Sequence, residues 1–183
     1  NSLLYGSAKT QRRANHDGEA DPISVQIAGA DPAMMAEAAR HNIDRGAQII
    51  DINMGCPAKK IAGNGSGVSL LRDLQLARQI IEATLEGAGS LPVSIKTRTS
   101  IKLPGGERSQ SSQDLLRFIN DLPIAAVMIH GRNFEAPWSE TVDYDYIKEV
   151  KALFPGIVIA NGGIYEPEMV KDVLEQTGAD GVG

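Results

Sequence analysis

Gln48-Ile-Ile-Asp-Ile-Asn-Met-Gly-Cys-Pro-Ala-Lys-Lys60 joins a short apolar segment to a polar turn. The apolar segment carries the β-branched residues typical of a buried strand, Ile49, Ile50 and Ile52. It gives way to the turn Gly55-Cys56-Pro57, in which the glycine permits unusual backbone angles and the proline fixes the exit. Cys56 is the only cysteine of the chain. We therefore expect its side chain to be aimed from the end of a strand rather than simply buried.

A short apolar strand followed by an amphipathic helix recurs along the chain. Strands are predicted over residues 23–28, 49–53, 92–97, 125–130, 157–161 and 179–183. Helices are predicted over residues 32–45, 74–86, 112–120, 144–153 and 167–176, with loops over 101–109 and 131–142. Residues 1–20 are polar and aperiodic, so we expect a flexible lead-in followed by one domain over residues 21–183. Such alternation predicts a parallel α/β sheet, either an open doubly wound sheet or a (β/α)8 barrel.

Polar residues fall at or near the carboxyl ends of five predicted strands. They are Gln26, then Asn53 with Cys56, then Lys96 with Arg98, then His130 with Arg132, and finally Asn161. In a barrel the carboxyl ends of all strands meet at one mouth, whereas an open sheet gathers only those beside its switch point. The pattern therefore favours a TIM (β/α)8 barrel, incomplete here with about six βα units. No metal site is expected, because no second cysteine or histidine lies at ligand spacing from Cys56.

Several segments together resemble one enzyme family. They are Asp51-Ile-Asn-Met-Gly-Cys-Pro-Ala-Lys-Lys60, Gly65-Ser-Gly-Val-Ser-Leu-Leu-Arg-Asp73, Val25-Gln-Ile-Ala-Gly29, Ile95-Lys-Thr-Arg98, Ile129-His-Gly-Arg132 and Ile159-Ala-Asn-Gly-Gly163. Their sequences and order resemble those of the tRNA-dihydrouridine synthases, closest to the bacterial B-type branch. The resemblance implies that the six strands are the third to eighth of a barrel. It also implies that the chain is a fragment, without the first two strands and the C-terminal helical domain.

The resemblance further implies the chemistry of the whole protein. Specific uridines of tRNA would be reduced to 5,6-dihydrouridine, with FMN as cofactor, NADPH as reductant and Cys56 as proton donor. The matching cofactor-binding residues are Gln26, Lys96, His130, Asn161, Gly162 and Gly163. The matching substrate-binding residues are Asn53, Lys59, Arg98 and Arg132. Gly163 departs from the family pattern, which usually reads Asn-Gly-Asp at this place, so any contact made by that acid is absent here.

Each of these residues also has a purely structural interpretation. Lys96 could form an ion pair with Asp51 inside the barrel, and His130 could be a hydrogen-bonded core residue. Gln26 could be an interior amide satisfied by its neighbours, and Asn161 could simply lead into a turn. Cys56 could be a small buried apolar residue. A cysteine thiol is, however, mostly protonated at neutral pH, which suits a general acid.

Composition limits the classes of function. The chain of 183 residues is 42% hydrophobic and 22% charged, which is ordinary globular composition, and it contains no apolar run long enough to span a bilayer. One cysteine fits a reducing, cytoplasmic setting, and we expect a monomer. The net charge of -5 argues mildly against a nucleic-acid partner. A local basic rim would offset it, and the candidates are Lys59, Lys60, Arg98, Lys102, Arg108 and Arg132.

Two other functions remain open at this point. The chain could belong to another FMN-dependent TIM-barrel reductase that acts on a small molecule. It could also be a truncated tRNA-binding remnant without activity.

Overall fold

The computed structural model describes residues 18, 20–107, 109–136 and 141–183. Six parallel strands form one sheet, in the order β1-β2-β3-β6-β7-β8. Their bounds are β1 Ser24–Ile27, β2 Ile49–Met54, β3 Val93–Arg98, β6 Ala126–His130, β7 Ile157–Asn161 and β8 Gly181–Val182. Five helices connect them, namely α2 Pro32–Ile43, α4 Leu74–Ala88, α5 Ser112–Phe118, α6 Tyr144–Leu153 and α7 Met169–Thr177.

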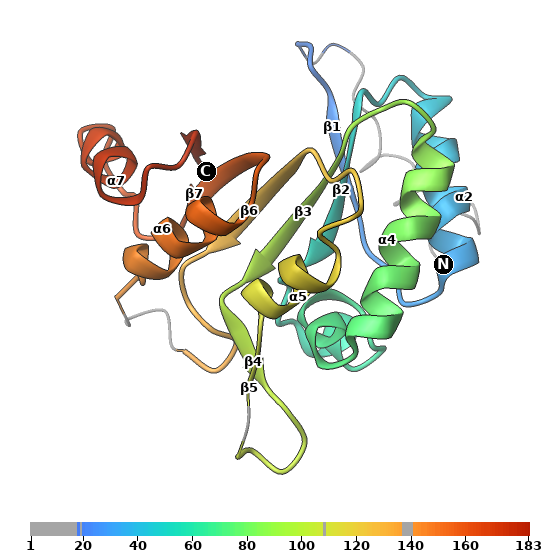
Figure 1. The fold of residues 1–183 in the computed structure, drawn as a ribbon. Coiled ribbons are helices and arrows are strands. Elements are labelled where there is room, and N and C mark those ends of the chain that lie inside the picture. Colours follow the sequence, from blue (N-terminus) through green and yellow to red (C-terminus); the bar gives the residue numbers. More distant parts are fainter. Residues whose placement is uncertain (1–17, 19, 108, 137–140) are drawn as a thin grey trace.

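The strand order identifies the architecture. Each strand pairs with the next strand of the sheet along the chain, so the order never reverses as it does at the switch point of a doubly wound sheet. Consecutive connecting helices contact one another, from α2 with α4 through to α6 with α7. Figure 1 shows these helices following the sheet from one edge to the other. The described chain therefore forms six successive strands of a TIM barrel with the five helices that connect them, in agreement with the barrel predicted from the positions of the polar residues.

The core lies between the strands and these helices. Alternate residues of β2 are fully buried, Ile50, Ile52 and Met54. They belong to one apolar cluster with helix residues such as Ile80, Ile81, Leu115 and Ile147. The intervening residues of β2, Asp51 and Asn53, lie on the opposite face of the sheet because successive strand side chains alternate. In a barrel that face is the interior, and β2 contributes two polar side chains to it.

Local sequence explains how the helices begin. The Asp31 side chain accepts a hydrogen bond from the backbone N–H of Met34 over 2.9 Å, and Pro32 occupies the first helical position of α2. Asp73 caps α4 in the same way, and Ser111 with Asp114 forms a reciprocal capping box on α5. The predicted boundaries of α6 and β7 are confirmed, and those of the other sheet strands and connecting helices differ by a few residues.

In the described part of the chain, four short elements lie outside the strands and helices predicted above. Residues expected as a loop after β3 instead contribute to an antiparallel pair, β4 Ser100–Lys102 with β5 Ser109–Ser111. This hairpin projects from the sheet in Figure 1. Between β2 and α4 the chain forms the short helix α3, Lys59–Ala62, and a 3-10 helix, Gly67–Arg72. In the described part of the chain, no helix combines the length and the apolar character needed to cross a membrane.

Candidate functional site

A pocket of about 500 Å³ opens at the carboxyl ends of the strands. Its walls come from β1, β2, β3, β6 and β7 and from the loops that follow them. Every sequence-predicted site residue except Lys59 lines it, namely Gln26, Asn53, Cys56, Lys96, Arg98, His130, Arg132, Asn161, Gly162 and Gly163. Parallel strands in sequential order bring these dispersed positions to one place. The predicted convergence at the barrel mouth is thus confirmed for the described residues.

The peptide of Cys56 is fixed on both sides. The Asn53 side-chain oxygen accepts hydrogen bonds from the backbone N–H groups of Gly55 (3.2 Å) and Cys56 (2.9 Å). The Cys56 carbonyl accepts from the backbone N–H of Val68 over 3.3 Å. Gly67 permits this approach, because a Cβ there would lie 2.8 Å from the Cys56 oxygen, and its φ is +62°. The Cys56 side chain is half-buried and faces the pocket from a turn that these hydrogen bonds hold in place.

Gly55 serves a different purpose from the one its sequence suggests. It is not among the described glycines with positive φ, so the expectation of unusual backbone angles is wrong. A Cβ at Gly55 would instead lie 3.3 Å from the backbone of Thr97, so the turn needs a residue without a side chain to pack against β3. The Gly55 carbonyl accepts a hydrogen bond from Nε of Arg98 over 2.9 Å. This bond holds the guanidinium beside the turn that carries Cys56.

Lys96 crosses the interior toward β7. Its Nζ donates a hydrogen bond to Oδ1 of Asn161 over 3.0 Å. Burial lowers the pKa of Lys96, the nearby Asp51 carboxylate partly opposes this, and Arg98 adds to the lowering. No ion pair within 4.0 Å joins Lys96 to Asp51 in the described part of the chain, so the simple ion-pair interpretation is wrong. The ammonium is available at the pocket wall.

His130 lies among cations. Its side chain is buried, with 7% of the residue exposed, and burial lowers its pKa to about 4, with further lowering by Arg98, Lys96 and Arg132. The imidazole is therefore neutral at pH 7 and carries one N–H donor and one acceptor nitrogen. Arg98 and Arg132 are also buried, with 9% and 6% exposed. The positive charges gathered around His130 repel one another, and this repulsion favours an anionic or electron-rich ligand in the pocket.

The turn after β7 provides backbone donors. Gly162 and Gly163 have φ values of +102° and +75°. A Cβ at Gly162 would lie 3.2 Å from the His130 ring, and one at Gly163 would lie 2.9 Å from the Tyr144 hydroxyl. Tyr144 donates a hydrogen bond to the Gly162 carbonyl over 3.0 Å, which steadies the turn. Two glycines here let a phosphate approach the main chain closely, as barrel loops in this position often do.

The site residues fit flavin mononucleotide. FMN has a planar ring whose edge carries donors and acceptors, and a phosphate group. The side-chain amide of Gln26 and the ammonium of Lys96 line the pocket and suit the ring edge. The Gly162-Gly163 turn and the surrounding cations suit the phosphate.

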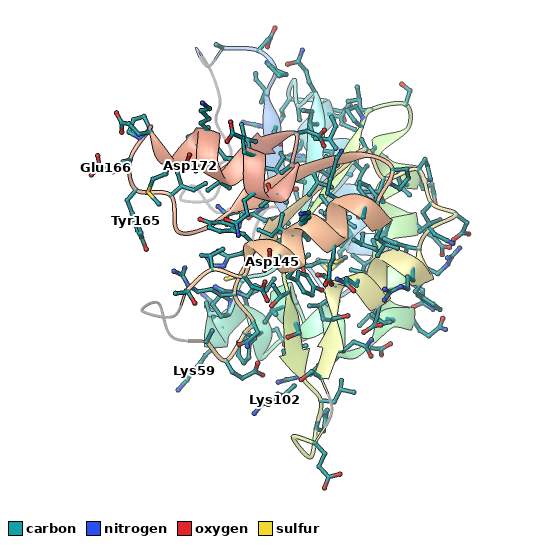
Figure 2. The ribbon with its side chains drawn as sticks, turned by 60° about the vertical axis from the view of Figure 1, so that its left-hand side comes forward. Lys59, Lys102, Asp145, Tyr165, Glu166 and Asp172 are labelled. Carbon is teal, nitrogen blue, oxygen red and sulfur yellow. The ribbon has the colours of Figure 1, made fainter. Side chains whose placement is uncertain are left out.

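The structure also adds residues that the sequence interpretation missed. Pro57, Ile164 and Tyr165 line the same pocket, and Tyr165 is 77% exposed. Tyr165 follows Gly163 by two residues in the sequence, and this position in a loop at the barrel mouth could have identified it as a pocket residue. Figure 2 shows Tyr165 projecting at one side of the molecule, while Lys59 and Lys102 point outward elsewhere. Lys59 does not line the pocket, so its predicted contact with substrate phosphates stays a prediction. Arg108 of the proposed basic rim lies outside the described residues.

Comparison with known proteins agrees with this geometry. A sequence profile of the family described as dihydrouridine synthase (Dus) matches residues 1–183. The tRNA-dihydrouridine synthase B of Xanthomonas axonopodis pv. citri is 42% identical over 179 residues, which are 98% of this chain and 52% of that protein. The enzyme of the same name from Pseudomonas aeruginosa is 43% identical over 178 residues, 97% of this chain and 52% of that protein. The chain therefore spans about half the length of the curated relatives it matches.

A solved structure shares the fold at much lower identity. An old yellow enzyme homologue from Zymomonas mobilis superposes with a TM-score of 0.58 and 17% identity, over 81% of this chain and 45% of that one. At this identity the likeness shows the fold alone.

Proposed function

Because this chain belongs to the dihydrouridine synthase family, we propose that the whole protein reduces uridines of tRNA to 5,6-dihydrouridine. One observation carries the proposal beyond the family match. The Cys56 thiol faces a pocket whose other walls hold Lys96, Arg98, His130 and Arg132. A proton donor and a group of cations around one cavity suit the addition of hydrogen to an electron-poor ring that is attached to a polyanion.

The cofactor in this proposal is FMN, with NADPH as the reductant. When bound, reduced FMN supplies the hydride that adds to C6 of the uracil ring. Gln26, Lys96, His130 and Asn161 would hold the ring edge, and Gly162 and Gly163 would hold the phosphate through their backbone N–H groups. Lys96 contributes a positive charge beside the ring, where the reduced form carries negative charge. Its bond to Asn161 supports this placement of the ammonium.

Cys56 supplies the proton. As C6 gains hydride, the electrons of the C5–C6 double bond take the proton from Sγ, and a thiolate is left. Arg98 interacts electrostatically with Cys56, and its hydrogen bond to the Gly55 carbonyl keeps it beside the turn. A cation in that place lies near the negative charge that proton transfer leaves on sulfur, until solvent returns the proton. This residue pair supports a general acid better than it supports a buried structural cysteine.

The substrate in this proposal is a uridine within tRNA. Asn53, Arg98 and Arg132 line the pocket and would contact the base and its sugar-phosphate, with Lys59 reaching phosphates outside it. The target base has to leave its stack to reach such a pocket. The net charge of -5 opposes RNA binding overall, but local cations at the mouth offset it where the RNA approaches.

The test is made in cells that lack all dihydrouridine synthases. The complete gene is supplied as wild type or as Cys56→Ala, and dihydrouridine in purified tRNA is measured by mass spectrometry. We expect wild type to restore dihydrouridine and the variant to be slower by about 10²- to 10⁴-fold, the usual contribution of a general acid. The variant should still bind flavin. A well-expressed, yellow wild-type protein that forms no dihydrouridine would instead indicate a reductase of small molecules. A protein that binds tRNA but holds no flavin would indicate a tRNA-binding remnant without activity.

A further inference from the structure

Asp51 lies beneath the pocket and does not line it. In the sheet it pairs with Gln26 on β1 and with Ser94 on β3, so the three residues form one row. Both carboxylate oxygens of Asp51 are engaged in short hydrogen bonds. Oδ2 accepts from Nε2 of Gln26 and Oδ1 accepts from Oγ of Ser94, each over 2.6 Å. The mechanism proposed above does not use this carboxylate.

A continuous series of side-chain hydrogen bonds leads from Asp51 to Cys56. The Gln26 amide, held by Asp51 through its nitrogen, presents Oε1 to Nδ2 of Asn53 over 2.8 Å. The Asn53 amide then presents Oδ1 to the backbone N–H groups of Gly55 and Cys56. We call this series, from Asp51 through Gln26 and Asn53 to the Cys56 N–H, the Asp51 relay.

The two ends of the relay fix its polarity. A backbone N–H can only donate, so Asn53 has to turn its oxygen toward Cys56 and its nitrogen toward Gln26. A carboxylate can only accept, so Gln26 has to turn its nitrogen toward Asp51 and its oxygen toward Asn53. Both requirements are met by the same orientation of the two amides. Without the carboxylate, the Gln26 amide could rotate and turn its nitrogen toward the Asn53 nitrogen, and the Asn53 amide would then no longer be held from the Gln26 side.

We propose that Asp51 is a positioning residue for Cys56, acting through the amides of Gln26 and Asn53. The role in catalysis rests on the proposed function, but the relay itself does not. Because the Cys56 N–H is held by Asn53, the relay fixes the direction in which the thiol leaves the turn. The same carboxylate orients Gln26, a predicted contact of the flavin. One partly buried acid would thereby align proton donor and cofactor to each other.

Hydrogen exchange tests the relay without any catalytic assay. In the complete protein, exchange at the Gly55 and Cys56 amides is measured by mass spectrometry for wild type, Asp51→Leu and Asp51→Asn. Leucine removes the acceptor and excludes water, so exchange should rise about 3- to 10-fold, the factor expected for one hydrogen bond. Asparagine can still accept from Gln26 with its oxygen and donate to Ser94, so exchange should stay at the wild-type rate. Ser94→Ala is the matched control and should also leave it unchanged.

Two results would overturn the proposal. One is unchanged exchange in a folded Asp51→Leu protein. The other is a rise in Asp51→Asn as large as in Asp51→Leu, because the charge rather than the acceptor would then matter. If Asp51→Leu does not fold, Gln26→Leu breaks the same relay at its middle, and unchanged exchange there overturns the proposal equally.

A kinetic test addresses the catalytic role. Reduction of the bound flavin by NADPH needs no proton from Cys56, so Asp51→Leu should slow it much less than it slows reoxidation by tRNA, and Asp51→Asn should slow neither step. Reoxidation by tRNA should be slow in Asp51→Leu alone, with a larger solvent deuterium isotope effect than in wild type. Equal reoxidation rates in wild type and Asp51→Leu would overturn the positioning role. A wild-type protein that does not respond to tRNA would overturn the proposed function, while the exchange result would still stand.

Discussion

Lys96 and Asn161 are joined by a hydrogen bond of 3.0 Å although their strands, β3 and β7, are separated by β6. Both side chains therefore lie on the inner face of the sheet and reach over the intervening strand. Asn161 also donates to the carbonyl of Gly183 just after β8, so the hydrogen bonding continues to the last strand of the chain. The polar groups that we assign to the cofactor therefore also bond to one another across the interior.

Replacing Lys96 should weaken cofactor binding without weakening the fold. Burial lowers the pKa of Lys96, so the unfolded chain holds this proton more firmly than the folded chain does. The charged Lys96 therefore lowers the stability of the folded state at pH 7. This destabilisation is lost only as pH rises toward the usual pKa of lysine. Lys96→Met removes that cost, so the melting temperature of the flavin-free protein should stay equal or rise. Flavin affinity should fall about 10- to 100-fold, because methionine cannot donate a charge-assisted hydrogen bond to the cofactor.

Thermal denaturation and flavin titration at pH 7 measure these two effects. Lys171→Met is a suitable control, because Lys171 is 81% exposed and pairs only with Glu175 on α7 among the described residues. The control should change neither quantity. A large loss of stability in Lys96→Met with normal flavin affinity would mean that the lysine is structural.

His130 should make the protein less stable in mild acid. Its pKa is about 4 in the folded protein, against 6.5 as the usual value, because of burial and the neighbouring cations. Between these two values the unfolded chain takes up a proton that the folded chain does not, so stability falls as pH falls from about 6.5 to about 4. The loss is at most about 3 kcal/mol. Urea unfolding across this range should show a shallower pH dependence for His130→Gln, and identical slopes would contradict the assignment.

The sequence predicted the strands and the pocket well for a specific physical reason. Residues such as Asn53 and Asn161 end apolar strands, and parallel strands in sequential order carry their ends to one place. The hairpin of β4 and β5 escaped prediction because Ser109–Ser111 has no apolar alternation to mark a strand. The Asp51 relay escaped it because Gln26 and Asp51 meet only through the register of β1 and β2. Contacts between side chains on neighbouring strands depend on the register of those strands, and the spacing of residues in the sequence does not reveal that register.

Gly163 should be costly to replace, and the comparison with Gly178 isolates the reason. Both glycines have similar positive φ, +75° and +68°, but a Cβ at Gly163 would meet Tyr144 and Val142 at 2.9 Å whereas one at Gly178 would meet nothing within 4 Å. Gly178→Ala should therefore lower the free energy of unfolding by about 1 kcal/mol, for the backbone alone. Gly163→Ala should cost about 1–3 kcal/mol more, because neighbours have to move.

Chemical denaturation of the two variants gives the comparison, and flavin titration adds a functional measure. Only Gly163→Ala should release flavin, since only that turn lies in the pocket. Equal free energies of unfolding for the two variants would show that Val142 and Tyr144 can move away from the added methyl group without destabilising the protein.

Tyr165 should contribute to binding and not to stability. It is 77% exposed beside the pocket, and an exposed aromatic ring in that place is suited to stacking on a nucleobase. Tyr165→Ala should weaken tRNA binding about 5- to 150-fold, the range for loss of one stacked base, while Tyr165→Phe keeps the ring and the affinity. Ile157 is the matched control, because it is 52% exposed at the other end of β7 and does not line the pocket. Gel-shift titration with unmodified tRNA should separate Tyr165→Ala from both Tyr165→Phe and Ile157→Ala. If Tyr165→Ala binds tRNA as wild type does, the ring does not contact the RNA and its exposure has no part in recognition.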